Sequence, residues 1–134
     1  MKRREFLGGV LFFASVPIWA MSRKTGSGLE GVKWRLSGFG WSRMAVPASA
    51  WIKLEGGRFR GNSGCNGLGG TYSIDGSSIR FRQGPSTMMA CPAMALETKF
   101  RRALEQVDSY ELKGENLILK KGKRALLVFS RGGV

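Results

Sequence analysis

Two-residue turns between short alternating runs are the feature that most restricts how this chain can fold. The dipeptides Gly56-Gly57 and Asp75-Gly76 each stand between two runs in which apolar and polar residues alternate. Glycine adopts the positive φ that a tight hairpin requires, and alternation is typical of a strand with one buried face. The sequence therefore predicts antiparallel hairpins. The expected strands are residues 32–36, 51–55, 58–60, 71–74, 78–82, 110–113, 117–120 and 125–129.

One segment has a different period. Between residues 93 and 107, apolar side chains recur at steps of three and four residues, which indicates an amphipathic helix. Pro92 suits the first helical turn, where its missing N–H leaves no hydrogen bond unmade. Short strands with a single late helix predict an α+β domain. We expect a curved antiparallel sheet, or a small open barrel, with the amphipathic helix packed against it.

The N-terminus has the composition of a targeting segment. Lys2-Arg3-Arg4 precedes an almost wholly apolar run from residue 6 to residue 20, which is short for a transmembrane helix of roughly 20 residues. The paired arginines before Phe6-Leu7 are similar to a twin-arginine export signal, while an ordinary Sec signal would explain the same charges. We expect export to the periplasm, with the signal either removed or retained uncleaved at the inner membrane.

The length of 134 residues suits one folded domain. We expect a signal peptide at residues 1–22, a polar linker at residues 23–31 and the domain at residues 32–131. No cysteine follows the apolar run of the signal, so a lipid anchor on the mature N-terminus is not expected.

The chain has two cysteines, Cys65 and Cys91. In an oxidising compartment a lone pair in a small domain is most simply a disulfide. Two separate buried thiols and a redox-active pair are the alternatives. A zinc site is not expected, because the chain has no histidine and two cysteines leave a tetrahedral shell unfilled.

The sequence shows no catalytic arrangement. It has no histidine to act as a base and no Gly-x-Ser-x-Gly elbow, and its acidic residues are scattered over turns and the helix. The glycine-rich run at residues 64–70 lacks the Gly-Lys-Ser/Thr ending of a phosphate loop, and its glycines suit a bend in the sheet instead. We therefore expect a protein without enzymatic activity, cofactor or metal.

The formal charge is +13, which would attract polyanions such as lipopolysaccharide. Four arginines alternate with apolar residues on two expected strands and would form a basic patch if those strands are neighbours. The aromatic residues between them, Phe59 and Phe81, point inward, so the exposed stacking surface of a nucleic-acid-binding barrel is not expected. The candidate basic patch consists of Arg58, Arg60, Arg80 and Arg82.

The central stretch and the helix also contain a distinctive set of residues. These are Gly64, Cys65, Asn66, Gly70, Tyr72, Thr87, Met89, Ala90, Cys91 and Glu97. Together they resemble the META domain, the HslJ-like family of bacterial heat-inducible proteins, and the similarity extends over nearly all of the expected domain.

This resemblance implies a compact α+β domain, a location in the cell envelope and a part in stress response, including resistance to novobiocin. It implies no catalytic residue and no cofactor. A further likeness to pilotin-type lipoproteins implies that a lipid or hydrophobic segment could be bound. We expect a binding or interaction module for an envelope protein, a lipid or an anionic envelope polymer. The alternative is a redox-active or lipid-binding periplasmic protein.

Overall fold

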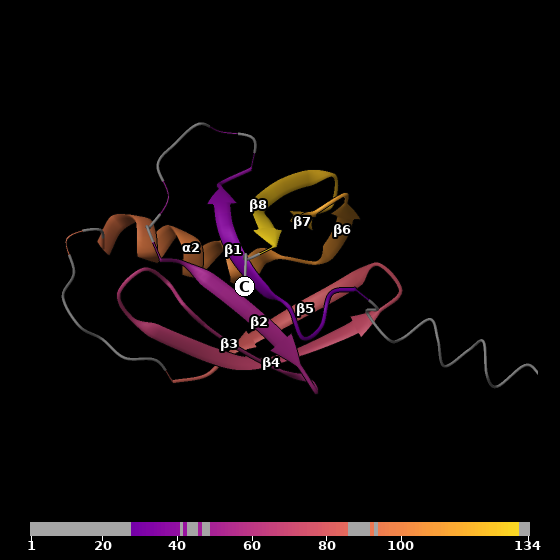
Figure 1. Cartoon of the computed structure of the whole chain (residues 1–134), viewed down its shortest axis with the longest axis horizontal. Helices are drawn as coiled ribbons and strands as arrows, with labels where there is room; N and C mark the ends of the chain where they lie inside the picture. Colours follow the sequence, from indigo (N-terminus) through magenta and orange to yellow (C-terminus); the bar gives the residue numbers. More distant parts are fainter. Residues whose placement is uncertain are drawn as a thin grey trace, which may run out of the picture.

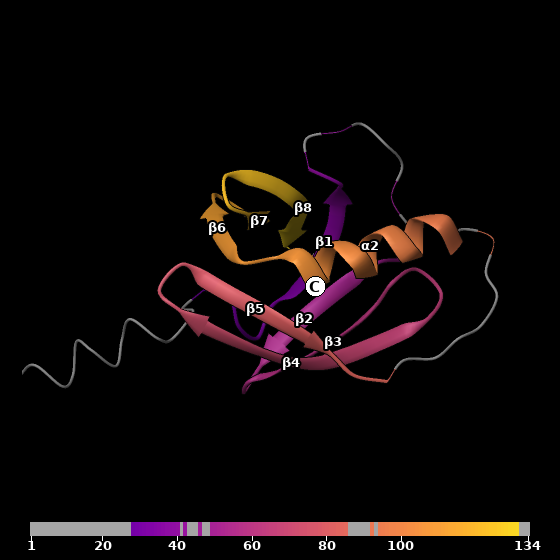
Figure 2. The same cartoon turned by 180° about the vertical axis from the view of Figure 1, so that it is seen from behind.

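The computed structural model describes residues 28–40, 42, 46, 49–85, 92 and 94–131. In this part of the chain, eight strands follow one another around an antiparallel barrel, and helix α2 enters between the fifth and sixth strands (Figure 1 and Figure 2). The elements are β1 (Lys33–Gly38), β2 (Trp51–Glu55), β3 (Arg58–Asn62), β4 (Gly67–Asp75), β5 (Ser78–Gln83), α2 (Met94–Gln106), β6 (Ser109–Lys113), β7 (Asn116–Lys121) and β8 (Arg124–Arg131).

Pairing between the first and last strands closes the barrel. Trp34 of β1 is registered with Arg131 of β8, and Leu36 with Phe129. The expected curved sheet or small open barrel is therefore corrected to a closed one. Turn signals link only strands that are adjacent in sequence, so they did not predict this pairing. Closure removes the unpaired edges that an open sheet would expose.

The contact between β5 and β6 is the shortest strand pairing around the barrel. Its register consists of one residue pair, Ser78 with Ser109, flanked by backbone hydrogen bonds of 3.2 Å from Ile79 to Asp108 and 2.9 Å from Tyr110 to Ser77. We call this contact the β5–β6 seam. By comparison, the β4–β5 ladder extends over six registered pairs.

Helix α2 is part of the connection between β5 and β6, and it contacts both β5 and β8. The side-chain amide of Gln83 on β5 donates a hydrogen bond of 2.8 Å to the carbonyl oxygen of Arg101 on the helix. Phe100 and Leu104 point from the helix into the core and are fully buried. The apolar stripe expected from the sequence is therefore the face that covers the barrel beside the seam.

Core side chains from the strands and the helix fill the barrel interior, as expected for a barrel of eight strands. The Phe100 and Phe129 rings lie 6.1 Å apart. The indole N–H of Trp34 is buried and donates a hydrogen bond of 2.9 Å to the Leu29 carbonyl. The fully buried apolar residues are Leu29, Trp34, Ile52, Leu54, Ile79, Phe100, Leu104, Leu117, Leu119, Leu127 and Phe129.

Residues 28–31, which the sequence places in a linker, form a turn that packs on the barrel. Leu29 is fully buried, and the Gly31 N–H donates a hydrogen bond of 2.8 Å to the Leu54 carbonyl. The expected signal peptide at residues 1–22 lies outside the described residues. No helix within the described ranges has both the length and the apolar character needed to span a bilayer.

Candidate functional site

Two residues of the family motif meet in a buried polar cluster. Glu97, in the first turn of α2, accepts hydrogen bonds at Oε1 from the Ser63 hydroxyl at 2.7 Å and from the Asn66 side-chain amide at 3.2 Å. The Asn66 backbone N–H donates to the same oxygen at 3.3 Å. None of these three residues is more than 2% exposed. The cluster fastens the helix to the loop between β3 and β4.

All three hydrogen bonds of the cluster go to one oxygen atom of the Glu97 carboxylate, Oε1. Within the described residues, Glu97 Oε2 has no hydrogen-bond partner. A buried carboxylate is costly unless hydrogen bonds compensate for lost water, and here three donors converge on the other oxygen. The described ranges contain no group of three His, Cys, Asp or Glu residues that could hold a metal. The hydrogen bonds between Asn66 and Glu97 join the loop between β3 and β4 to the first turn of α2.

Cys65 lies in the loop that Glu97 holds. It is disulfide-bonded, and no described cysteine is free. Its expected partner, Cys91, lies outside the described residues, so the pairing of Cys65 with Cys91 stays a prediction. Thr87, Met89 and Ala90 of the motif also lie outside them.

Three further motif residues shape β4 and its approach. Gly64 has a φ of 131°, which L side chains rarely adopt. A side chain at Gly70 would collide with the Arg82 carbonyl on β5. The Tyr72 hydroxyl donates to the carboxylate of Glu30, and burial, followed by this hydrogen bond, raises the pKa of Tyr72 to about 12.

The four candidate arginines lie on the outer face of the barrel, two on β3 and two on β5. Arg58 and Arg82 are both registered with Thr71 of β4, one from each side. Their strands are thus separated by β4 and are not neighbours, which places the two backbones roughly 10 Å apart. On the same face, Arg60 is registered with Gly69 and Arg80 with Ser73.

Lys53 of β2 extends this surface, because it is registered with Arg60. We call the set of Lys53, Arg58, Arg60, Arg80 and Arg82 the basic face. Two hollows of about 530 and 460 Å³ lie on it, and both border Thr71. Gly69 and Gly84 line the larger one, where the absence of side chains leaves room between the cations.

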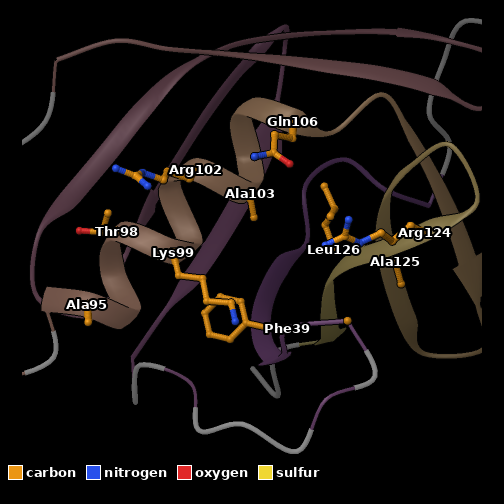
Figure 3. Close-up of a pocket in the computed structure, with 11 residues that line it drawn as sticks. Phe39, Ala95, Thr98, Lys99, Arg102, Ala103, Gln106, Arg124, Ala125 and Leu126 are labelled. Carbon is orange, nitrogen blue, oxygen red and sulfur yellow. The ribbon is translucent and has the colours of Figure 1, made fainter.

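A separate cavity of about 390 Å³ lies between α2 and β8, and we call it the helix cavity (Figure 3). Lys99 lies beside Phe39, with its Nζ 4.9 Å from the ring centroid. Arg124 and Leu126 face them from the β8 side. The described residues that line it are Phe39, Gly40, Ala95, Thr98, Lys99, Arg102, Ala103, Gln106, Arg124, Ala125 and Leu126.

Sequence reasoning did not identify the helix cavity. Lys99 and Arg102 stand one helical turn apart, which by itself indicates only a solvated helix face. Arg124 follows Lys121 and Lys123 in a short run that is mostly basic. Only the packing of α2 beside β8 brings these cations to one cavity.

A family model described as META domain matches residues 27–133. The fold is similar to the NMR structure of a protein from Burkholderia xenovorans, with a TM-score of 0.64, 24% identity, and coverage of 79% of this chain and 85% of the other. It is also similar to the crystal structure of a DUF4847 family protein from Bacteroides vulgatus ATCC 8482, with a TM-score of 0.62, 16% identity, and coverage of 80% and 96%. No curated protein matches the sequence significantly.

Proposed function

Since the chain belongs to the META domain family, we propose that it is an exported, non-enzymatic module whose basic face binds an anionic polymer of the cell envelope. The resemblance described above supports a part in envelope stress response and in tolerance of novobiocin. The composition of the N-terminal segment supports export, and the charge of +13 supports an anionic partner.

The basic face is the observation that carries this proposal. Its four arginines are exposed and project from two strands on either side of β4. Guanidinium groups bind phosphate and carboxylate oxygens in pairs, so they suit lipopolysaccharide, whose core and lipid A carry phosphates. Glu55, registered with Arg58, is an acid on this surface. An extended row of cations suits a polymer with repeated charges.

The chemistry of the described residues supports the absence of enzymatic activity. Glu97 is the buried acid, and its hydrogen bonds tie it to Ser63 and Asn66. No histidine is present anywhere in the sequence to serve as a base. The barrel interior holds core side chains, which favours binding at the outer surface over binding inside the barrel.

Binding of the exported protein to lipopolysaccharide at increasing salt tests the proposal. Replacing Arg58, Arg60 and Arg82 together with glutamine should weaken binding by about tenfold or more and flatten its salt dependence, because charge-assisted contacts are lost. The control replaces Lys113, Lys121 and Lys123 with glutamine, which removes the same charge elsewhere. Equal losses in the two triple variants would indicate a diffuse field and contradict a specific basic face.

A cellular test addresses the stress role. A strain that lacks the protein should become more sensitive to novobiocin, and the wild-type chain should restore tolerance. The basic-face variant should fail to restore it, while the control variant should succeed. Full restoration by both variants would separate the stress role from the basic face.

A further inference from the structure

The helix cavity has the size and lining of a small-molecule site. Its volume of about 390 Å³ falls within the range of roughly 300–1,000 Å³ seen for such sites. Phe39 and Leu126 provide apolar surface, and the small side chains of Ala103 and Ala125 leave the space between them open. A compact apolar group could therefore be covered on more than one side.

The charged side chains among the described lining residues are all cationic. Lys99 comes from α2 and Arg124 from β8, and Figure 3 shows the two on opposite sides of the opening. Arg102 is also part of the lining, and none of the described lining residues is acidic. Cations that converge on a partly enclosed space raise the local concentration of anions.

We infer that the helix cavity binds a small organic anion, with a compact apolar body on Phe39 and Leu126 and a carboxylate or phosphate between Lys99 and Arg124. Gln106 and Thr98 add neutral hydrogen-bonding groups to the lining. This site is distinct from the basic face, because it lies between α2 and β8 and the basic face lies on β2 to β5. It takes a single molecule and requires no envelope polymer.

Three naphthalene probes separate the contribution of the anionic group to the affinity from the contribution of the apolar ring. 1-Naphthoate and 1-naphthyl phosphate carry the proposed anionic groups, and 1-naphthalenemethanol is their neutral counterpart. Titration of the folded protein by calorimetry should give clearly tighter binding for at least one anion than for the alcohol. Comparison of the two anions identifies the preferred head group.

Variants of the cavity test where the probes bind. Arg124→Gln should weaken binding of the preferred anion by about tenfold, since hydrogen bonds to charged groups are among the stronger ones. Lys123→Gln is the matched control, because it removes the same charge from an adjacent exposed residue outside the lining. This control should bind as the wild type does.

A filled cavity tests the apolar half of the inference. Ala103→Leu keeps every cation but places a larger side chain in the space, so it should weaken binding of all three probes. Its thermal unfolding is measured alongside to confirm a folded protein. Equal affinity for the alcohol and the anions, equal effects of Arg124→Gln and Lys123→Gln, or unchanged binding to folded Ala103→Leu would overturn the assignment.

Discussion

Glu97 accepts hydrogen bonds from three donors through one oxygen atom, and all three belong to the short loop between β3 and β4. An acid in the first turn of a helix also interacts favourably with the helix dipole. These contacts explain why a charged residue stands on the apolar stripe of α2. The motif includes both Glu97 and Asn66, but it predicted no contact between them, and the structure shows that Ser63 completes the cluster.

Tyr72 offers a residue-scale prediction on pH. Its pKa is raised from 10.0 to about 12 by burial and then by the hydrogen bond to Glu30. A raised folded-state pKa gives stability that is fully present below pH 10 and is lost as the pH rises through 12. The loss should be roughly 1–2 kcal/mol, after allowance for solvent screening.

Urea unfolding of the wild type and of Tyr72→Phe at pH 9 and pH 11.5 measures this loss. The wild type should lose more free energy of unfolding between the two pH values than the variant does. Both proteins keep Tyr110, so its ionisation contributes to both curves. Equal losses would show that Tyr72 ionises at its ordinary pKa in the folded protein.

At the scale of elements, β4 differs most from its expected form. The sequence predicts a strand at residues 71–74, whereas β4 begins at Gly67 and includes Gly69 and Gly70. Glycine is depleted in strands, so the sequence predicted a bend in the sheet at residues 64–70 rather than a continuous strand. The strand forms because glycine allows close approach to neighbouring backbones, which propensity does not measure.

Gly70 and Gly84 form a matched pair for testing this explanation. A Cβ at Gly70 would collide with the Arg82 carbonyl, whereas a Cβ at Gly84 would meet its nearest atom at 3.6 Å, an ordinary contact. Gly70→Ala should lower the free energy of unfolding by about 1–3 kcal/mol. Gly84→Ala should change it by about 0.5 kcal/mol or less. Equal effects on the urea midpoint would contradict close approach as the reason for glycine in β4.

The hairpin turns and the helix could be predicted because their signals are local. Gly56, Gly57 and Gly76 all have the positive φ expected of their turns, and α2 falls within the predicted residues 93–107. The placement of the arginines was predicted less well, since it depends on β4 separating β3 from β5. The helix cavity depends on contacts between distant segments, and no local pattern predicts it.

At the scale of the whole molecule, the strand ladders differ in length around the closed barrel. β8 shares six registered pairs with β7 and four with β1, whereas β5 and β6 share one registered pair and two flanking hydrogen bonds. Helix α2 contacts β5 beside this seam, where the Gln83 side chain donates a hydrogen bond to the Arg101 carbonyl. A barrel built in this way should open first where its ladder is shortest.

Native-state hydrogen exchange tests that order of opening. The amides of Ile79 and Tyr110, which bridge the seam, should exchange at least about tenfold faster than the hydrogen-bonded amides of the β7–β8 ladder. Their exchange should also depend weakly on urea, because opening the seam exposes little surface, while the β7–β8 amides should follow global unfolding. Equal protection at both places, with the same dependence on urea, would mean that α2 and the core lock the seam into the cooperative unit despite its short ladder.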